Sequence, residues 1–415
     1  MQIIPKWARC DVEEMVELAC RVNVNAHGLR DDSGSNFVVG VGMFPLAAMI
    51  NHSCRPNCTF TYHGEKMMVR TLEPVKAGTE LTVYYIDLLQ STADRQRMLL
   101  ESKHFLCCCP RCETRGLADV YLDGVCCLDC GQDGCLAATP PPTQEEDIAA
   151  QLMLLGQDST DTGTKKSGGK GSGGKGKKKA NRGSGSSAAS GGEDTASRSS
   201  SKPAQGGCNG AAIGINSRNG TTGNMFYCSS CGREYQRTAV EEGVARAKAA
   251  WDAAMAVLRA KDFPGARKKL EKWLEDYDAG SAPPTATYKK SMAKKGKLKL
   301  HPMHATVVQT LVPTANCCNY EEDFSGSARY LRRAITAMEA VYPRNFPELG
   351  DFYAALGEAL TALLDKRAQL LPRKTRDQVS SERKAALSRA TEIRCVCLGE
   401  DHPTTKEARR AMAKG

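Results

Sequence analysis

The sequence predicts an α+β protein, in which a β-rich part with a cysteine cluster is followed by an all-α part. Three observations predict this class: short alternating apolar runs before residue 86, clustered cysteines at 107–112, and helical periodicity from about residue 237. At 415 residues the chain is long enough for two or three domains. Its apolar runs fall short of the ~18 residues that a membrane-spanning helix needs, so we expect no membrane association.

One helix and four strands are expected before residue 113. From Asp11 to Val24 apolar residues recur at helical spacing, and Asp11 suits the N-cap position. The residues of this apolar face are Val12, Met15, Val16, Ala19 and Val22. The strands are expected in the runs NFVVGVGMF (36–44), CTFTYHG (58–64), KMMVRTL (66–72) and TELTVYY (79–85). In the last run, alternation places Tyr84 and Tyr85 on opposite faces, and either tyrosine taken singly fits a core position.

The chain from about residue 237 onward is expected to be entirely helical. Helical runs cover 239–262, 264–277, 301–318, 327–342, 347–364 and about 380–398. Small residues recur where antiparallel helices must approach closely, at Ala245, Ala249, Gly326, Ala334, Ala355 and Gly357. Helix pairs of this length joined by short turns indicate a tetratricopeptide-like stack, and an unrelated helical bundle is the alternative.

A basic, glycine-rich insertion at about 140–225 separates these two parts. Between Gly156 and Asn224 the chain carries eleven Lys or Arg, four Asp or Glu, and 18 of its 38 glycines. Such a composition cannot bury a core, so we expect disorder. Most of the net charge of +10 falls in this stretch, and we therefore expect a solvated insertion with at most weak nucleic-acid contact.

The cysteines indicate metal ligation in a reducing compartment, the cytoplasm or the nucleus. Among the 19 cysteines, Cys107, Cys109 and Cys112 form a C-x-C-x-x-C cluster whose thiolates can converge on one zinc ion. Tetrahedral zinc needs a fourth ligand. The spacing leaves three candidates for that ligand, namely Cys54, Cys58 and Cys108.

Two further C-x-x-C knuckles predict a second zinc site of the ribbon type. They are Cys127 with Cys130 and Cys228 with Cys231. The long separation between the knuckles is mostly the insertion, and loop-closure entropy grows only slowly with length. Neighbouring cysteines that could substitute for a ligand or play no part are Cys126, Cys135 and Cys208.

Several of these segments, taken together, resemble a known family. GVGMFPLAAMINHSCRPNC, GTELTVYYIDL and FLCCCPRC occur in the order in which the C-terminal half of a SET domain and its cysteine-rich post-SET tail carry such motifs. The later knuckles and helices make the chain similar to the SET-and-MYND branch of protein lysine methyltransferases. The resemblance is specific over about 10–113 and loose over 237–415.

The resemblance implies a β-clip SET fold and a set of site residues. It assigns S-adenosylmethionine contacts to Asn51 and His52, a further contact to Asn25, packing on the adenine to Phe105, and the active-site role to Tyr85. It also assigns the fourth position of the post-SET zinc to Cys54. One position departs from the family, because Lys103 stands where an aromatic residue is usual.

The implied function is that of an S-adenosylmethionine-dependent protein-lysine N-methyltransferase acting on histones or other proteins. The alternative is a non-catalytic SET remnant that binds protein partners through its helical part. The Gly-x-Gly turn of a complete SET domain and a MYND zinc finger are not found before Asp11. We therefore expect a partial SET domain from a truncated form, with weak cofactor binding by the chain as it stands.

These considerations divide the chain into five parts. They are an insert-like helical segment at 1–30, the C-terminal half of a SET domain at 31–106, a post-SET zinc cluster at 107–118, zinc knuckles at 119–236 split by the insertion, and a tetratricopeptide-like domain at 237–415.

Overall fold

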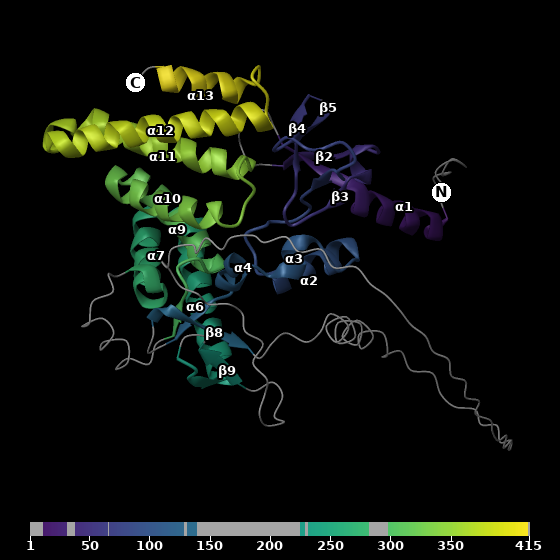
Figure 1. Ribbon diagram of the computed structural model, residues 1–415, viewed down its shortest axis with the longest axis horizontal. Helices are drawn as coiled ribbons and strands as arrows, with labels where there is room; N and C mark the ends of the chain where they lie inside the picture. Colours follow the sequence, from purple (N-terminus) through teal and green to yellow (C-terminus); the bar gives the residue numbers. More distant parts are fainter. Residues whose placement is uncertain are drawn as a thin grey trace, which may run out of the picture. The chain divides into compact units, whose positions relative to one another are not determined.

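The computed structural model describes residues 11–30, 38–64, 66–127, 131–138, 225–228, 231–281 and 298–413 (Figure 1). These residues confirm the predicted α+β class, with small sheets and cysteine clusters followed by a mostly helical region. Among them, none of the helices has the length and apolar character needed to cross a membrane. The predicted insertion and Cys130 lie outside the described residues.

Within its described residues, the first part contains one α-helix, a short 3-10 helix and three two-stranded sheets. Helix α1 is Val12–Asn25, and the strands are β1 Ala26–Arg30, β2 Val38–Met43, β3 Asn51–His52, β4 Cys58–His63, β5 Lys66–Thr71 and β6 Thr82–Val83. The antiparallel pairs are β1 with β2 and β4 with β5, whereas β3 and β6 pair in parallel. Gly64, at φ 56°, makes the turn between β4 and β5 in the left-handed region that glycine tolerates.

Two expectations for this part need correction. The fourth strand was expected over 79–85, but β6 is only Thr82–Val83. It stops there because the amide of Tyr85 donates to the His52 ring instead of a strand partner. The predicted helix forms, yet the side chain of Asp11 makes no capping hydrogen bond, and the apolar face that includes Val12 and Met15 is exposed among the described residues.

Three helices follow the first part, and the cysteines at 107–112 lie between and within them. The helices are α2 Thr92–Lys103, α3 Pro110–Thr114 and α4 Leu117–Leu122. Ser91 caps α2 by accepting a hydrogen bond from the Asp94 amide at 3.2 Å. His104 ends the helix in the left-handed conformation, at φ 59°, and so turns the chain toward Phe105 and the cysteines.

A five-stranded sheet follows, with the order β10-β9-β8-β7-β11. Its strands are β7 Val125–Cys127, β8 Gly131–Ala138, β9 Met225–Cys228, β10 Glu234–Gln236 and β11 Lys299–Leu300. The prediction that everything after residue 237 is helical is wrong at β11. A strand of two residues is too short to show alternation in the sequence. It forms because it pairs with the edge of β7.

The remaining elements are helices that pack in chain order (Figure 1). They are α6 Arg237–Arg259, α7 Phe263–Tyr277, α9 Ala305–Tyr320, α10 Phe324–Glu339, α11 Pro347–Arg367, α12 Arg373–Cys397 and α13 Pro403–Ala413. A Cβ at Gly357 would lie 2.4 Å from Leu387, so this glycine permits the close approach of α11 and α12. Gly326 has another role, since its amide donates to Asp323 at the start of α10.

The SET-like part and the helices share a hydrophobic core. Leu72 and Leu99 belong to the same buried cluster as Phe346 and Ile393. Asn345 adds a polar link by donating from Nδ2 to the carbonyl of Leu72 at 2.7 Å. This packing brings α9, α10 and α11 next to Tyr85, where the candidate site lies.

Candidate functional site

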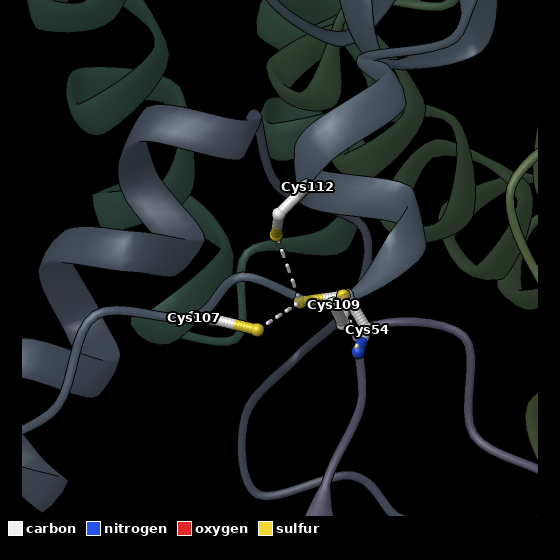
Figure 2. Close-up of side chains that lie close together, drawn as sticks. All are labelled: Cys54, Cys107, Cys109 and Cys112. Carbon is white, nitrogen blue, oxygen red and sulfur yellow. Dashed lines mark hydrogen bonds between the residues drawn. The ribbon is translucent and has the colours of Figure 1, made fainter. Parts of the chain in front are cut away.

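Four cysteine side chains converge, one from the loop between β3 and β4 and three from the segment after α2 (Figure 2). The sulfur atoms of Cys54, Cys107, Cys109 and Cys112 all lie within 4.8 Å of one another. The Cys54 sulfur is 3.5 Å from that of Cys112 and 3.9 Å from that of Cys107. Tetrahedral zinc with bonds of about 2.3 Å separates its sulfur ligands by about 3.8 Å, so the cluster has the size and donor set for zinc.

The structure also separates the three candidates for the fourth thiol. Cys54 lies in the cluster, whereas Cys108 is exposed and Cys58 is buried on β4 outside it. The amide of Cys54 donates to the Cys109 sulfur at 3.4 Å. Proline at the first position of α3 starts a helical turn that brings Cys112 back beside Cys109. Hydrogen bonds from neighbouring thiols lower the pKa of Cys109 and favour its thiolate. The largest contribution comes from Cys107.

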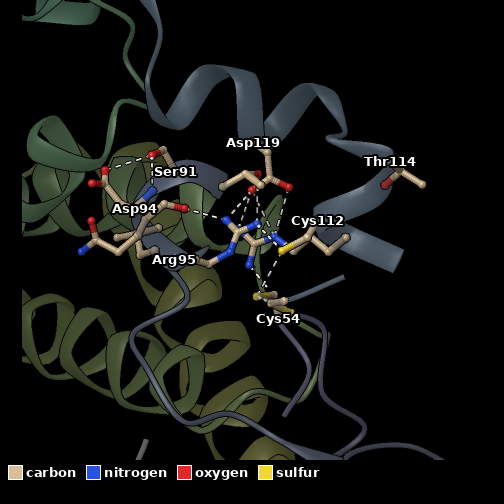
Figure 3. A network of polar contacts seen from close by, with 12 residues as sticks. Cys54, Ser91, Asp94, Arg95, Cys112, Thr114 and Asp119 are labelled. Atoms are coloured by element: carbon tan, nitrogen blue, oxygen red, sulfur yellow. Dashed lines mark hydrogen bonds and ion pairs between the residues drawn. The ribbon is translucent and has the colours of Figure 1, made fainter. Parts of the chain in front are cut away.

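A buried charge network lies directly beside the thiols (Figure 3). Asp119 accepts from Arg95 at 2.6 Å and from Arg111 at 2.9 Å. Arg95 also approaches the Cys112 sulfur at 3.7 Å, and Arg111 donates to the carbonyl of Cys54 at 3.0 Å. Burial alone would lower the pKa of Arg95, but Asp119 and the cysteines raise it, so the guanidinium stays charged. Four thiolates around Zn²⁺ carry a net charge of −2, which this network of net charge +1 partly offsets.

Sequence reasoning missed this network. Arg95 and Asp119 are 24 residues apart on two different helices, so their contact has no local sequence signal. Arg111 sits inside the cysteine cluster, and that position was its only sequence signal.

His52 connects the cysteine cluster to Tyr85. Its Nδ1 accepts from the Tyr85 amide at 3.0 Å, so the ring proton is on Nε2, which faces the Cys54 sulfur at 3.2 Å. Burial lowers the pKa of His52 to about 4, and the imidazole is therefore neutral at physiological pH. Because the parallel pairing of β3 and β6 sets Asn51–His52 beside Thr82–Val83, the ring is held in one orientation.

The five residues that the resemblance assigns to cofactor and catalysis lie along one cavity of about 610 Å³, here called the smaller cavity. They are Asn25, Asn51, His52, Tyr85 and Phe105. The rings of Tyr85 and Phe105 meet edge to face, with centroids 6.4 Å apart. Asn51 donates from Nδ2 to Glu80 at 2.8 Å. The structure thus brings all five together, although Asn25 and Asn51 are far apart in the chain.

A second cavity of about 760 Å³, the larger cavity, adjoins the first. Its lining includes Tyr84, Asp87 and residues of α9, α10 and α11 such as Val312, Met338 and Phe352. Tyr85 lines both cavities. Tyr84 lines only the larger one and stacks on Phe60, so the two tyrosines have different surroundings.

Two residues with polar side chains, Tyr85 and Lys103, line both cavities. The Tyr85 hydroxyl donates to the carbonyl of Ile50 at 2.6 Å, and burial raises its pKa, so it stays protonated. Lys103 donates from Nζ to the carbonyl of Val24 at 2.7 Å and lies 5.8 Å from the centroid of the Tyr85 ring. Burial lowers the pKa of Lys103. The residue that departs from the family therefore lines both cavities beside Tyr85.

The second cysteine group is partly described. The sulfur atoms of Cys127, Cys228 and Cys231 lie within 4.8 Å of one another. Cys130, which the sequence predicts as their fourth partner, lies outside the described residues, so that assignment stays a prediction.

The first part of the chain is similar to known SET domains. The SET-domain family model matches residues 12–86, which include α1, the three small sheets and Tyr85. The chain is 39% identical over 77 residues to "Histone-lysine N-methyltransferase SMYD3" of Mus musculus, a match that covers 19% of this chain and 18% of that protein.

Two further relatives extend the match. "N-lysine methyltransferase SMYD2" of Homo sapiens is 39% identical over 105 residues, covering 25% of this chain and 24% of the relative. "Histone-lysine N-methyltransferase ASHR1" of Arabidopsis thaliana is 30% identical over 160 residues, covering 37% of this chain and 32% of the relative. The chain therefore contains a SET domain related to those of the SMYD and ASHR1 lysine methyltransferases, and it matches at most about a third of these relatives' own length.

Proposed function

We propose that the protein is an S-adenosylmethionine-dependent protein-lysine N-methyltransferase. The observation that carries the proposal is the position of Tyr85, which lines both cavities and whose hydroxyl is held by the carbonyl of Ile50. A methyl transfer needs two compartments that meet at one point, one for the donor and one for the acceptor. The names of the relatives include both histone-lysine and N-lysine methyltransferases, so we propose a protein lysine as acceptor without choosing the protein.

The smaller cavity is the proposed cofactor side. Asn51 and Asn25 offer amide groups for hydrogen bonding, and Phe105 and His52 offer flat ring surfaces against which an adenine can pack. When bound, S-adenosylmethionine supplies an electrophilic methyl group on a cationic sulfonium. The neutral His52 is suited to this place because a charged imidazolium would repel that cation.

The larger cavity is the proposed lysine side. Its apolar walls on α9–α11 suit the aliphatic stem of a lysine, and Asp87 and Glu348 in its lining suit an incoming ammonium. The amine must be neutral to react, and the Lys103 cation beside the Tyr85 ring favours loss of its proton. The Tyr85 hydroxyl can then orient the amine as a neutral hydrogen-bonding group.

Tyr85→Phe is expected to lower the rate of methyl transfer by about 100-fold, the loss typical for one positioned hydrogen-bond donor at a reacting centre. Affinity for S-adenosylmethionine should change little, because the ring remains. The measurement is transfer of labelled methyl to lysine in histones and other proteins, with calorimetry for cofactor binding. Tyr84→Phe is the matched control, since Tyr84 lines only the larger cavity, and it should retain activity within a few-fold.

Two outcomes contradict the proposal. Methyl transfer that is unaffected by Tyr85→Phe would remove Tyr85 from the mechanism. A folded, zinc-loaded protein that transfers no methyl group to any protein lysine would favour the alternative, a non-catalytic protein-binding scaffold.

Lys103→Met is expected to tighten S-adenosylmethionine binding by about five-fold. A lysine cation and a sulfonium that share one half-buried cavity repel each other by about 1 kcal/mol. Lys103→Arg keeps the positive charge and serves as the control, with unchanged affinity. Calorimetry at two salt concentrations checks this, because added salt should reduce the difference. Equal affinities for the Met and Arg variants would show that the charge of Lys103 has no effect.

A further inference from the structure

We propose that Cys127, Cys228 and Cys231 hold a second, structural zinc ion, and that this ion fixes the sheet segment from which helix α9 enters the wall of the larger cavity. The metal centre itself does not depend on the proposed function. Only its effect on substrate binding rests on that function.

Two of the three thiols, Cys228 and Cys231, form a metal-binding knuckle, and the third thiol, Cys127, faces it from β7. The amide of Cys231 donates to the Cys228 sulfur at 3.5 Å, and the amide of Gly232 donates to the Cys228 carbonyl at 2.9 Å. Gly232 has φ 70°, which lets the chain turn tightly after Cys231. The turn holds both thiols on one side, and the Cys127 sulfur lies 3.8 Å from that of Cys231. This separation again matches the edge of a zinc–thiolate tetrahedron.

The surroundings of these thiols favour a bound cation. Cys127 and Cys228 are fully buried. The hydroxyl of Tyr235, on β10, lies 3.1 Å from the Cys127 sulfur, where it can donate to a thiolate and orient it. Clustered thiolates select zinc over calcium or magnesium, which prefer oxygen ligands.

The ligands come from strands that are too short to be stable alone. Cys127 ends the three-residue β7, and Cys228 ends the described four-residue β9. Strands of this length need further support, and a structural zinc ion contributes its binding free energy directly to folding. The ion would join β7 and β9 across a long intervening stretch of chain, for which the closure cost rises only logarithmically.

The sheet passes this constraint to α9. Leu300 of β11 pairs with Val125 of β7, and the His301 amide donates to the Gly124 carbonyl at 2.8 Å. The His301 ring stacks on Tyr121 with centroids 3.9 Å apart. His304 then caps α9, accepting from the Thr306 amide at 3.1 Å.

Helix α9 begins directly after these contacts and lines the larger cavity. The lining residues that it supplies are Val308, Gln309, Val312 and Pro313. A zinc ion that holds β7 would therefore also hold β11, which pairs with β7, and helix α9, which follows β11. In this way the ion would set the position of the cavity wall that α9 supplies. If the proposed function holds, loss of this ion should raise KM for the protein substrate and leave cofactor affinity unchanged.

The test counts metal ions in the purified protein. We expect two zinc ions per chain, and one in Cys231→Ser, a variant chosen because Cys231 is exposed and its loss leaves no cavity in a core. Cys231→His should restore the second ion, since imidazole also binds zinc. Cys108→Ser is the control, because Cys108 is exposed and belongs to neither cysteine group, and it should retain two ions.

A second measurement follows the path to α9. Hydrogen exchange at the His301 amide, which donates to the Gly124 carbonyl, should become at least ten-fold faster in Cys231→Ser, while exchange at the Cys54 amide stays unchanged. One zinc ion in the unaltered protein, or two in Cys231→Ser, would overturn the metal site. Loss of the ion without faster exchange at the His301 amide would overturn its role in placing α9. Neither readout requires methyl transfer, so failure here is distinguishable from failure of the proposed function.

Discussion

Cys109→Ser is expected to release the zinc ion held by the first cysteine group and to lower the free energy of unfolding by about 3–5 kcal/mol, or roughly 10 °C in melting temperature. Cys109 belongs to the four-thiol group and accepts from the Cys54 amide. Without a fourth thiolate, the ion loses its closed tetrahedral site. Arg95 then remains buried beside a cysteine cluster that has lost its metal.

The same substitution should disturb the smaller cavity. Cys54 contacts the Nε2 of His52, whose Nδ1 accepts from the Tyr85 amide, so the cysteine cluster fixes the orientation of this ring. We expect S-adenosylmethionine binding to weaken together with metal loss. Metal content, thermal unfolding and calorimetry on the same sample measure the three effects.

Cys108→Ser is the matched control for Cys109→Ser. It removes the adjacent thiol, which is exposed and outside the cluster, and it should change stability by less than about 0.5 kcal/mol. If the two variants retain equal amounts of zinc, Cys109 is not a ligand. If Cys109→Ser loses zinc but unfolds at the same temperature as the unaltered protein, the ion does not stabilise this part of the chain.

The candidate site shows which contacts local sequence can and cannot predict. The spacing of Cys107, Cys109 and Cys112 predicts a cluster because all three lie in the short segment 107–112. The choice of Cys54 came from the family resemblance alone, since a contact across more than fifty residues has no local signal. The family motifs likewise predicted that Asn51, His52, Tyr85 and Phe105 meet, and the structure brings them together along one cavity.

Other features arise only from tertiary structure. Strand β11 forms because it can pair with the edge of β7. A segment as short as Lys299–Leu300 carries no sequence pattern that would predict this pairing. The apolar periodicity of α1 correctly predicted a helix, but periodicity does not reveal what a helix packs against, and its apolar residues are exposed among the described residues. Lys103 appeared in the sequence only as a departure from the family, and its contact with both cavities became visible in three dimensions.

Asp119→Asn is expected to lower the free energy of unfolding by about 3–5 kcal/mol, although it changes one atom. Asp119 is the shared acceptor of Arg95 and Arg111, and Arg95 is 0% exposed. An asparagine can still accept hydrogen bonds but carries no charge, so two buried guanidinium groups would lose their carboxylate partner. Chemical denaturation measures the loss.

A surface ion pair provides the comparison for this buried one. Glu382→Gln removes the partner of Arg332, whose guanidinium binds the carboxylate at 2.6 and 2.7 Å on an exposed surface. Because solvent screens such pairs, the expected loss is less than about 1 kcal/mol. Similar losses in the two variants would show that the Arg95–Asp119–Arg111 network behaves like a surface pair.

The network also predicts that the effects of substituting Arg95 and Asp119 on stability are not additive. This non-additivity distinguishes a role of charge from a role of side-chain packing. Arg95→Met removes one of the two positive charges, so adding it to Asp119→Asn should cost less than the sum of the two single losses, by at least about 1 kcal/mol. The zinc content of Asp119→Asn should stay unchanged below its melting temperature, because Arg95 and Arg111 still face the anionic cysteine cluster. Strict additivity of the two substitutions would mean that Asp119 stabilises the fold by shape alone, and zinc loss in Asp119→Asn would mean that the carboxylate orients the cysteine ligands.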